Sequence, residues 1–215
     1  MSTATRIAMI GAGNVGGNLG ARLSNAGFPV RFGVREGTDT KAVLEASAKD
    51  AAAVSIPEAI AWAEVVFLAV PGSVALDVAA SLAASLAGKV VVDCNNPLVW
   101  KDGPVWTPPP EGSLAAAIAK AAPGARVVKG FNQFGAEFHK DPSLAGSPAQ
   151  VFLAGDDADA KKTVSEIASK GGFEPVDAGP LRNAAVLENV AILWIHLATV
   201  GGQGRDFALK LQRRA

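Results

Sequence analysis

The fold is decided by one stretch, Ile7-Ala8-Met9-Ile10-Gly11-Ala12-Gly13-Asn14-Val15-Gly16. Its apolar residues 7–10 predict a short buried strand, and a helical pattern follows the glycines. Gly11 allows a tight turn off the strand, Gly13 lets the backbone approach a pyrophosphate, and Gly16 lets the helix pack closely on the sheet. This order predicts a dinucleotide site at the helix N-terminus, where backbone N–H groups attract phosphate. A glycine-rich turn with a purely structural role is the alternative.

Composition excludes several classes of function. The chain has 215 residues, and its 20 basic residues balance 20 acidic ones, so no overall charge favours nucleic acid or a lipid surface. The single cysteine, Cys94, excludes a disulfide framework and argues against a thiolate metal cluster. Residues 1–6 lead directly into the first strand, and residues 190–200 are too few to span a bilayer. We therefore expect a cytoplasmic protein with no membrane partner and no metal.

Strand-like and helical patterns alternate along the chain, which predicts a parallel sheet covered by helices on both faces. Strands are expected at residues 6–10, 30–33, 54–56, 65–70, 89–93, 126–129, 150–154 and 174–177. Helices are expected at residues 15–26, 40–50, 57–62, 74–86, 113–121, 158–169 and 183–199. The fold class is thus a doubly wound α/β (Rossmann) fold with a mainly parallel sheet and a small C-terminal helical portion. We expect a nucleotide-binding domain at 1–145, with 146–215 closing the cleft and forming a dimer contact.

Residues 95–112 interrupt this alternation. Five prolines forbid a helix there, and the segment also contains Trp100 and Trp106. Loops of this length are often functional, and this one follows a strand, at the sheet edge where ligands of open α/β folds bind. We expect this segment to form one wall of the site for the nicotinamide or the second substrate. Alternatively, its tryptophans pack against the rest of the domain or against a second subunit.

The end of the second strand favours NADP over NAD. An NAD site usually places an acidic residue there for the ribose, whereas an NADP site has a basic residue near the 2′-phosphate. Here uncharged Gly33 and Val34 are followed by Arg35, whose guanidinium can bind phosphate in a fork, and by Thr38 and Lys41 as further donors. Glu36 is the opposing signal, because it could bind ribose or neutralise Arg35.

Three later strands end in loops that we expect to line the same cleft. The relevant positions are Val70-Pro71, Asn95 and Asn132. The chain contains no tyrosine, so carbonyl reduction with a tyrosine acid is excluded. We expect His139 to lie at the surface and His196 in the core or an interface. These groups suit hydride exchange between two bound cofactors, which needs positioning and little acid–base chemistry.

Several motifs resemble the NADPH-dependent reductases of the deazaflavin coenzyme F420, which are also similar to the cytosolic domain of the STEAP metalloreductases. The resemblance covers nearly the whole chain. The motifs that show the resemblance lie at residues 11–16, 32–35, 69–71, 92–98, 128–132, 154–157, 177–183 and 187–188. The Gly-Asp-Asp run at 155–157, paired with Asp-Ala-Gly-Pro-Leu at 177–181, is the most specific.

The resemblance implies direct hydride transfer between NADP(H) and a planar acceptor, either F420 or a flavin (FAD or FMN), in a protein that often dimerises. No acid or base residue is then required. The predicted cofactor-binding residues are Gly11, Ala12, Gly13, Asn14, Val15, Gly16, Val34, Arg35, Thr38, Val70, Pro71 and Asn95, with Asn132 and Pro180 at the second substrate. The chain departs from the family at Val34, where a hydroxyl is common, and at Phe131-Asn132, where archaeal members have His-Thr. It also has one residue fewer in the glycine loop.

Two other functions remain open on the sequence alone. One is an imine or carbonyl reductase resembling pyrroline-carboxylate reductases, although the C-terminal part is short for their interlocked helical dimer. The other is a non-catalytic NADP(H) sensor, which would bind the nucleotide tightly without turnover.

Overall fold

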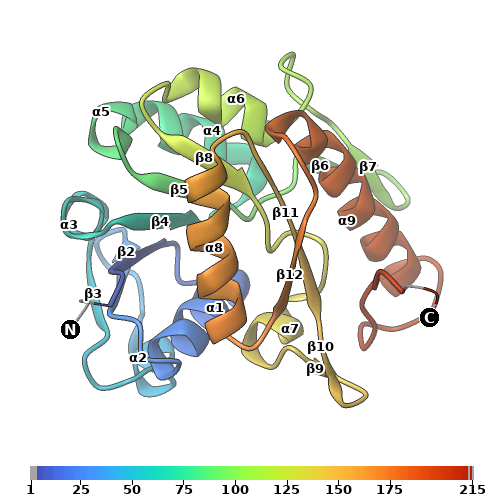
Figure 1. Ribbon diagram of the computed structural model, residues 1–215, viewed down its shortest axis with the longest axis horizontal. Helices are drawn as coiled ribbons and strands as arrows, with labels where there is room; N and C mark the ends of the chain where they lie inside the picture. The colour runs from blue at the N-terminus through green and yellow to red at the C-terminus, as the bar shows by residue number, and fades with distance from the viewer. Residues whose placement is uncertain (1–3, 213, 215) are drawn as a thin grey trace.

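The computed structural model describes residues 4–212 and 214 and is centred on one eight-stranded sheet (Figure 1). The strand order is β12-β11-β8-β5-β4-β1-β2-β3. The strands are β1 (Ile7–Ile10), β2 (Val30–Val34), β3 (Ala52–Ser55), β4 (Val65–Leu68), β5 (Val90–Asp93), β8 (Arg126–Lys129), β11 (Gln150–Gly155) and β12 (Glu174–Asp177). All pairs from β3 through to β8 are parallel, and only β11 runs antiparallel to its neighbour β8. The predicted mainly parallel, doubly wound sheet is confirmed.

The order of the strands reverses at β1. This strand pairs with β2 on one side, Ile10 opposite Gly33, and with β4 on the other, Ile10 opposite Leu68. The chain therefore leaves β1 and β4 in opposite directions across the sheet. Such a switch point opens a crevice at the carboxyl ends of the strands, where doubly wound folds bind their ligands.

Both faces of the sheet are buried, as expected for parallel strands that read as continuous apolar runs. In β1, Ile7 and Met9 face one core, and Ala8 and Ile10 face the other. The first core is covered by α1 (Asn14–Asn25), α7 (Ala136–Lys140) and α8 (Ala158–Lys170). The second is covered by α3 (Ile56–Trp62), α4 (Gly72–Ser81), α5 (Ala83–Leu86) and α6 (Leu114–Ala121). A short helix, α2 (Lys41–Glu45), lies beside α1.

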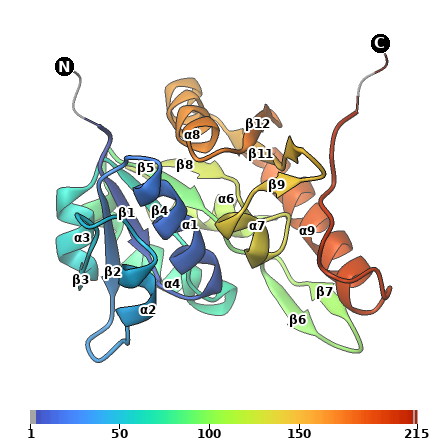
Figure 2. The ribbon, with the colours of Figure 1, turned by 90° about the horizontal axis from the view of Figure 1, so that it is seen from below.

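The last helix, α9 (Ala184–Thr199), follows a 3-10 turn, η1 (Leu181–Asn183), and contributes to both cores. Beside it lies a hairpin of β6 (Leu98–Trp100) and β7 (Pro104–Trp106), as Figure 2 shows. A second small hairpin joins β9 (Ser143–Leu144) to β10 (Ser147–Pro148). No helix among the described residues is long and apolar enough to cross a membrane.

The structure contains two elements that the sequence did not predict, α7 and the β9–β10 hairpin, and it differs from the prediction in three further places. Residues 95–112 contain no helix, as expected, but they form the β6–β7 hairpin rather than a plain loop. The helix expected at 74–86 is divided into α4 and α5, because the backbone of Leu82 (φ −107°, ψ 7°) leaves the helical region. The helix expected at 40–50 ends at Glu45.

Candidate functional site

The turn from β1 into α1 is closed so tightly that its first and last glycines admit no side chain. Gly11 has a φ of +103°, and a Cβ there would lie 2.4 Å from the carbonyl oxygen of Ala69 at the end of β4. A Cβ on Gly16 would lie 2.2 Å from the carbonyl oxygen of Gly11. The turn therefore holds α1 against the ends of two strands, and the helix begins directly at the sheet edge.

Gly13, between these two glycines, has open space where a side chain would lie. It is the exposed N-cap of α1, and a Cβ built on it would have no heavy atom of the described residues within 4 Å. No side chain caps α1, so the N–H groups of its first turn remain available to a ligand. Together with the partial positive charge of a 12-residue helix, they form an open cradle for phosphate. The residues present thus fit a dinucleotide pyrophosphate.

Arg35, the residue predicted to recognise the 2′-phosphate of NADP, lies at the surface just after β2. Val34, the last strand residue, is half-buried, whereas Arg35 and Thr38 are exposed and are joined by a turn in which the Thr38 N–H donates to the Arg35 carbonyl at 3.1 Å. Within the described residues, the Arg35 guanidinium has no hydrogen bond or ion pair, and Glu36 does not neutralise it. The guanidinium is therefore available to an anionic ligand.

Asn95 follows β5, and its side chain points into the protein. Its Nδ2 donates to the Leu68 carbonyl at 3.0 Å and to Asp93 Oδ1 at 2.9 Å. The amide therefore ties together the ends of β4 and β5. On the α4 side, a Cβ on Gly72 would lie 2.2 Å from the Asn96 carbonyl oxygen, so the loop after β5 sits directly on the start of α4. Val70 is half-buried and Pro71 is exposed at the same edge.

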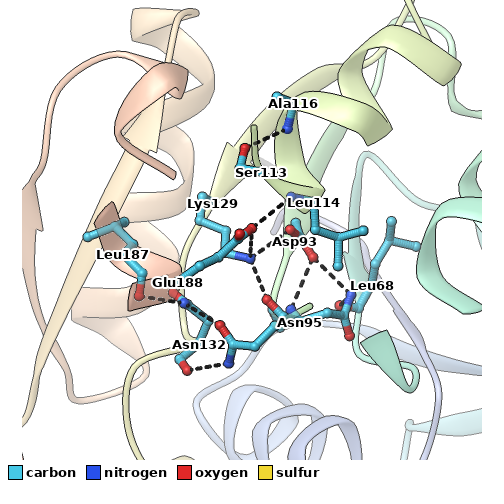
Figure 3. Close-up of polar contacts among 12 residues, drawn as sticks. Leu68, Asp93, Asn95, Ser113, Leu114, Ala116, Lys129, Asn132, Leu187 and Glu188 are labelled. Atoms are coloured by element: carbon cyan, nitrogen blue, oxygen red, sulfur yellow. Dashed lines mark hydrogen bonds and ion pairs between the residues drawn. The ribbon is translucent and has the colours of Figure 1, made fainter. Parts of the chain in front are cut away.

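Asn132 joins the end of β8 to the β5 loop and to α9 (Figure 3). Its Nδ2 donates to Asn96 Oδ1 at 2.9 Å and to the Leu187 carbonyl at 3.1 Å, and Asn96 Nδ2 donates back to the Asn132 carbonyl at 2.9 Å. Asn132 Oδ1 is buried and has no partner among the described residues. Phe131 before it has a φ of +60°, a strained conformation for a bulky residue. The half-buried Pro180 lies just before η1.

Behind these loops lies a fully buried ion cluster (Figure 3), which sequence reasoning missed. Lys129 Nζ donates to Asp93 Oδ2 at 2.8 Å, to Glu188 Oε1 at 3.1 Å, and to the Asn95 carbonyl. All three charged side chains are 0% exposed. Glu188 also accepts the Leu114 N–H at 2.9 Å and Trp106 Nε1 at 3.0 Å. The cluster thus connects β5, β8, α6, α9 and the hairpin.

The hairpin tryptophans and the single cysteine differ in their surroundings. Trp106 packs on the body through Glu188, whereas Trp100 is 58% exposed. Cys94 is buried, and desolvation together with the Asp93 charge raises the pKa of its thiol, so it is a packing residue rather than a nucleophile.

The surface position predicted for His139 is wrong, because the ring is fully buried. Its Nε2 donates to the Phe131 carbonyl at 2.9 Å, and it lies against Phe134, with ring centroids 5.0 Å apart. Burial lowers the pKa of His139 to about 4. His196, expected in the core or an interface, is exposed on α9.

This burial predicts a pH dependence of stability. The pKa of His139 is lower when folded (about 4) than its ordinary value of 6.5, so the unfolded chain binds the proton more readily. The free energy of unfolding should therefore fall as the pH drops from about 6.5 to about 4, by up to about 3 kcal/mol. Urea denaturation across this range measures it. His139→Gln, which can still donate to Phe131, should flatten the profile; an unchanged profile would show that His139 is not responsible.

Comparison with known proteins agrees with this geometry. A family model described as "NADP oxidoreductase coenzyme F420-dependent" matches residues 6–97. The F420-dependent NADP reductase of Methanothermobacter marburgensis is 31% identical over 211 residues, covering 89% of this chain and 92% of that protein. Metalloreductase STEAP3 of Rattus norvegicus is 32% identical over 189 residues, covering 88% of this chain but only 37% of the metalloreductase.

A solved structure extends the agreement to the whole fold. The crystal structure of a putative F420-dependent NADP reductase from Arthrobacter sp. FB24 superposes with a TM-score of 0.86 at 30% identity, covering 98% of this chain and all of that one. The family model covers the glycine loop and the first five strands of the sheet, and the relative and the superposed structure each cover most of the chain. The chain therefore belongs to the family of F420-dependent NADP oxidoreductases.

Proposed function

We propose that this chain transfers a hydride between NADP(H) and a planar acceptor cofactor, with deazaflavin F420 as the first candidate and FAD or FMN as alternatives. The observation that carries the proposal is the open phosphate cradle at Gly13, in a chain that matches F420-dependent NADP reductases over most of its length. NADP(H), when bound, supplies or accepts the hydride. The protein then needs to bind and orient two flat rings and exclude water.

The residues divide by the part of the ligands that they would hold. The backbone of Gly11, Ala12, Gly13, Asn14, Val15 and Gly16 would bind the pyrophosphate. Val34, Arg35 and Thr38 would surround the 2′-phosphate. Val70, Pro71 and Asn95 would border the nicotinamide, with Asn95 acting through its backbone because its amide is committed to β4 and β5. Asn132, whose buried Oδ1 has no partner among the described residues, and Pro180 would border the acceptor.

Arg35→Ala tests the preference for NADP. Removing one charged hydrogen-bond partner of the 2′-phosphate should weaken NADPH binding by about 1.5–3 kcal/mol and leave NADH nearly unaffected. Fluorescence titration with both nucleotides gives the comparison. Lys41→Ala, on the neighbouring helix, shows whether loss of any nearby cation has the same effect. Equal losses for NADPH and NADH in Arg35→Ala would mean that the side chain does not recognise the phosphate.

Stopped-flow mixing identifies the acceptor. Protein loaded with NADPH is mixed separately with F420, FMN, FAD and a panel of cyclic imines, and NADPH absorbance is followed. Oxidation with F420 or a flavin supports the proposal. Oxidation only with imines would replace it by an imine reductase, and tight NADPH binding without any turnover would favour a nucleotide sensor.

We also propose that residues 146–215 close the cleft and that a second copy covers the outer face of α9. Exposed apolar side chains gather there and on the adjacent hairpin, namely Val99, Trp100, Val186, Leu193 and Val200. Exposed apolar side chains gathered in this way are typical of an interface. Sedimentation velocity separates the dimer expected here from a monomer.

A further inference from the structure

The ion cluster behind the strand ends contains unequal numbers of positively and negatively charged groups. It contains one ammonium, Lys129, and two carboxylates, Asp93 and Glu188, all fully buried. Every partner of the two carboxylates is an N–H donor. Asp93 accepts from Lys129, from the Asn95 backbone and from Asn95 Nδ2, and Glu188 accepts from Lys129, the Leu114 backbone and Trp106 Nε1. Such an arrangement suits two ionised carboxylates, which leaves one net negative charge.

Other groups compensate this charge only in part. Leu114 is the first residue of α6, so its N–H brings the partial positive end of that helix to Glu188. Within the described residues, Lys129 is the only cation within 4.0 Å of either carboxylate. The neighbouring Cys94 thiol stays neutral, because burial raises its pKa. A net negative potential therefore remains at this point of the sheet.

The position of the cluster connects it to the proposed nicotinamide site. Asp93 is the last residue of β5, and the cluster holds both the carbonyl and the side chain of Asn95, two residues further along the chain. The same asparagine reaches the end of β4 beside the switch point. A buried charge at the end of β5 is poorly screened by solvent or salt.

From these observations we infer that the Asp93–Lys129–Glu188 cluster stabilises the oxidised, positively charged nicotinamide and so favours hydride departure from NADPH. NADPH becomes NADP⁺ by losing one hydride, two electrons with one proton, to the acceptor, and its ring gains one positive charge. The two nucleotides are otherwise identical. The ratio of their dissociation constants therefore reports the electrostatic potential at the ring. The inference rests on the proposed NADP(H) site.

The test is to measure the dissociation constants of NADP⁺ and NADPH for wild type and for Glu188→Gln. Neutralising Glu188 should weaken NADP⁺ by about tenfold and leave NADPH within about twofold, because only the oxidised ring carries the charge on which a buried carboxylate acts. Asp77→Asn removes the same charge from an exposed site on α4 and should change neither constant. An equal change for both nucleotides in Glu188→Gln would show a merely structural role and overturn the inference.

A measurement on wild type keeps the inference testable if Glu188→Gln does not fold. The wild-type protein should bind NADP⁺ more tightly than NADPH, so that the potential of the bound pair is lower than that of the free pair. Tighter binding of NADPH would overturn the inference while leaving the proposed function intact. Failure of folded wild type to bind either nucleotide would instead overturn the proposed function itself.

Discussion

Replacing Gly13 by alanine is expected to weaken NADPH binding by about 100-fold or more without destabilising the fold. A methyl group at this position meets no heavy atom of residues 4–212 within 4 Å beyond its chain neighbours, and the backbone φ of −77° suits alanine. The methyl would instead occupy the space through which a pyrophosphate reaches the helix N–H groups. Loss of two charge-assisted hydrogen bonds, each contributing about 1.5–3 kcal/mol, accounts for the size of the effect. Fluorescence titration and thermal unfolding measure the two properties.

Two other glycines give matched controls. Gly11→Ala places a side chain 2.4 Å from the Ala69 carbonyl in a left-handed conformation, and should destabilise the fold by about 2–4 kcal/mol as well as abolish binding. Gly88→Ala, also left-handed but in open space, should cost about 1 kcal/mol of stability and leave binding unchanged. Unaltered NADPH affinity in Gly13→Ala would show that the pyrophosphate does not lie at α1.

Lys129→Met is expected to reduce the free energy of unfolding by about 3–5 kcal/mol. The substitution keeps an unbranched side chain, shorter by the ammonium group, but leaves two buried carboxylates, Asp93 and Glu188, without their cation. Their remaining N–H donors offset only part of the cost of burying two like charges. Urea denaturation measures the loss.

Lys161→Met is the matched control for this cluster. Lys161 pairs with Asp177 at 2.8 Å, but the carboxylate is 67% exposed, so water can replace the lost partner. The expected loss of stability is below about 1 kcal/mol. A similar loss for both variants would mean that burial of the Lys129 cluster carries no special cost.

The sequence alone predicted the sheet because parallel strands are buried on both faces and read as apolar runs. The strand regions near residues 6–10, 65–70 and 89–93 correspond to β1, β4 and β5. The β6–β7 hairpin was missed because its prolines and short strands carry no alternating pattern. Its strands are three residues long, and Pro104 stands opposite Trp100 at the end of the pairing.

Burial that depends on residues distant in the sequence could not be predicted from local patterns either. His139 lies in a polar local sequence, but its ring is buried against Phe134 and bonded to the Phe131 carbonyl. Lys129 and Glu188 are 59 positions apart, so no local pattern relates them. A usable signal did exist, since each is a charged residue at the end of or inside an otherwise apolar run. Such residues are rarely buried without a partner.

Calorimetric titration of the wild-type chain with NADPH tests most directly whether the amide groups at the start of α1 bind a nicotinamide nucleotide. Saturable binding at one site per chain is predicted, weaker for NADH and lost in Gly13→Ala. Absence of any saturable heat with NADPH and NADP⁺ at millimolar concentration, from protein that is fully folded, would contradict the assignment.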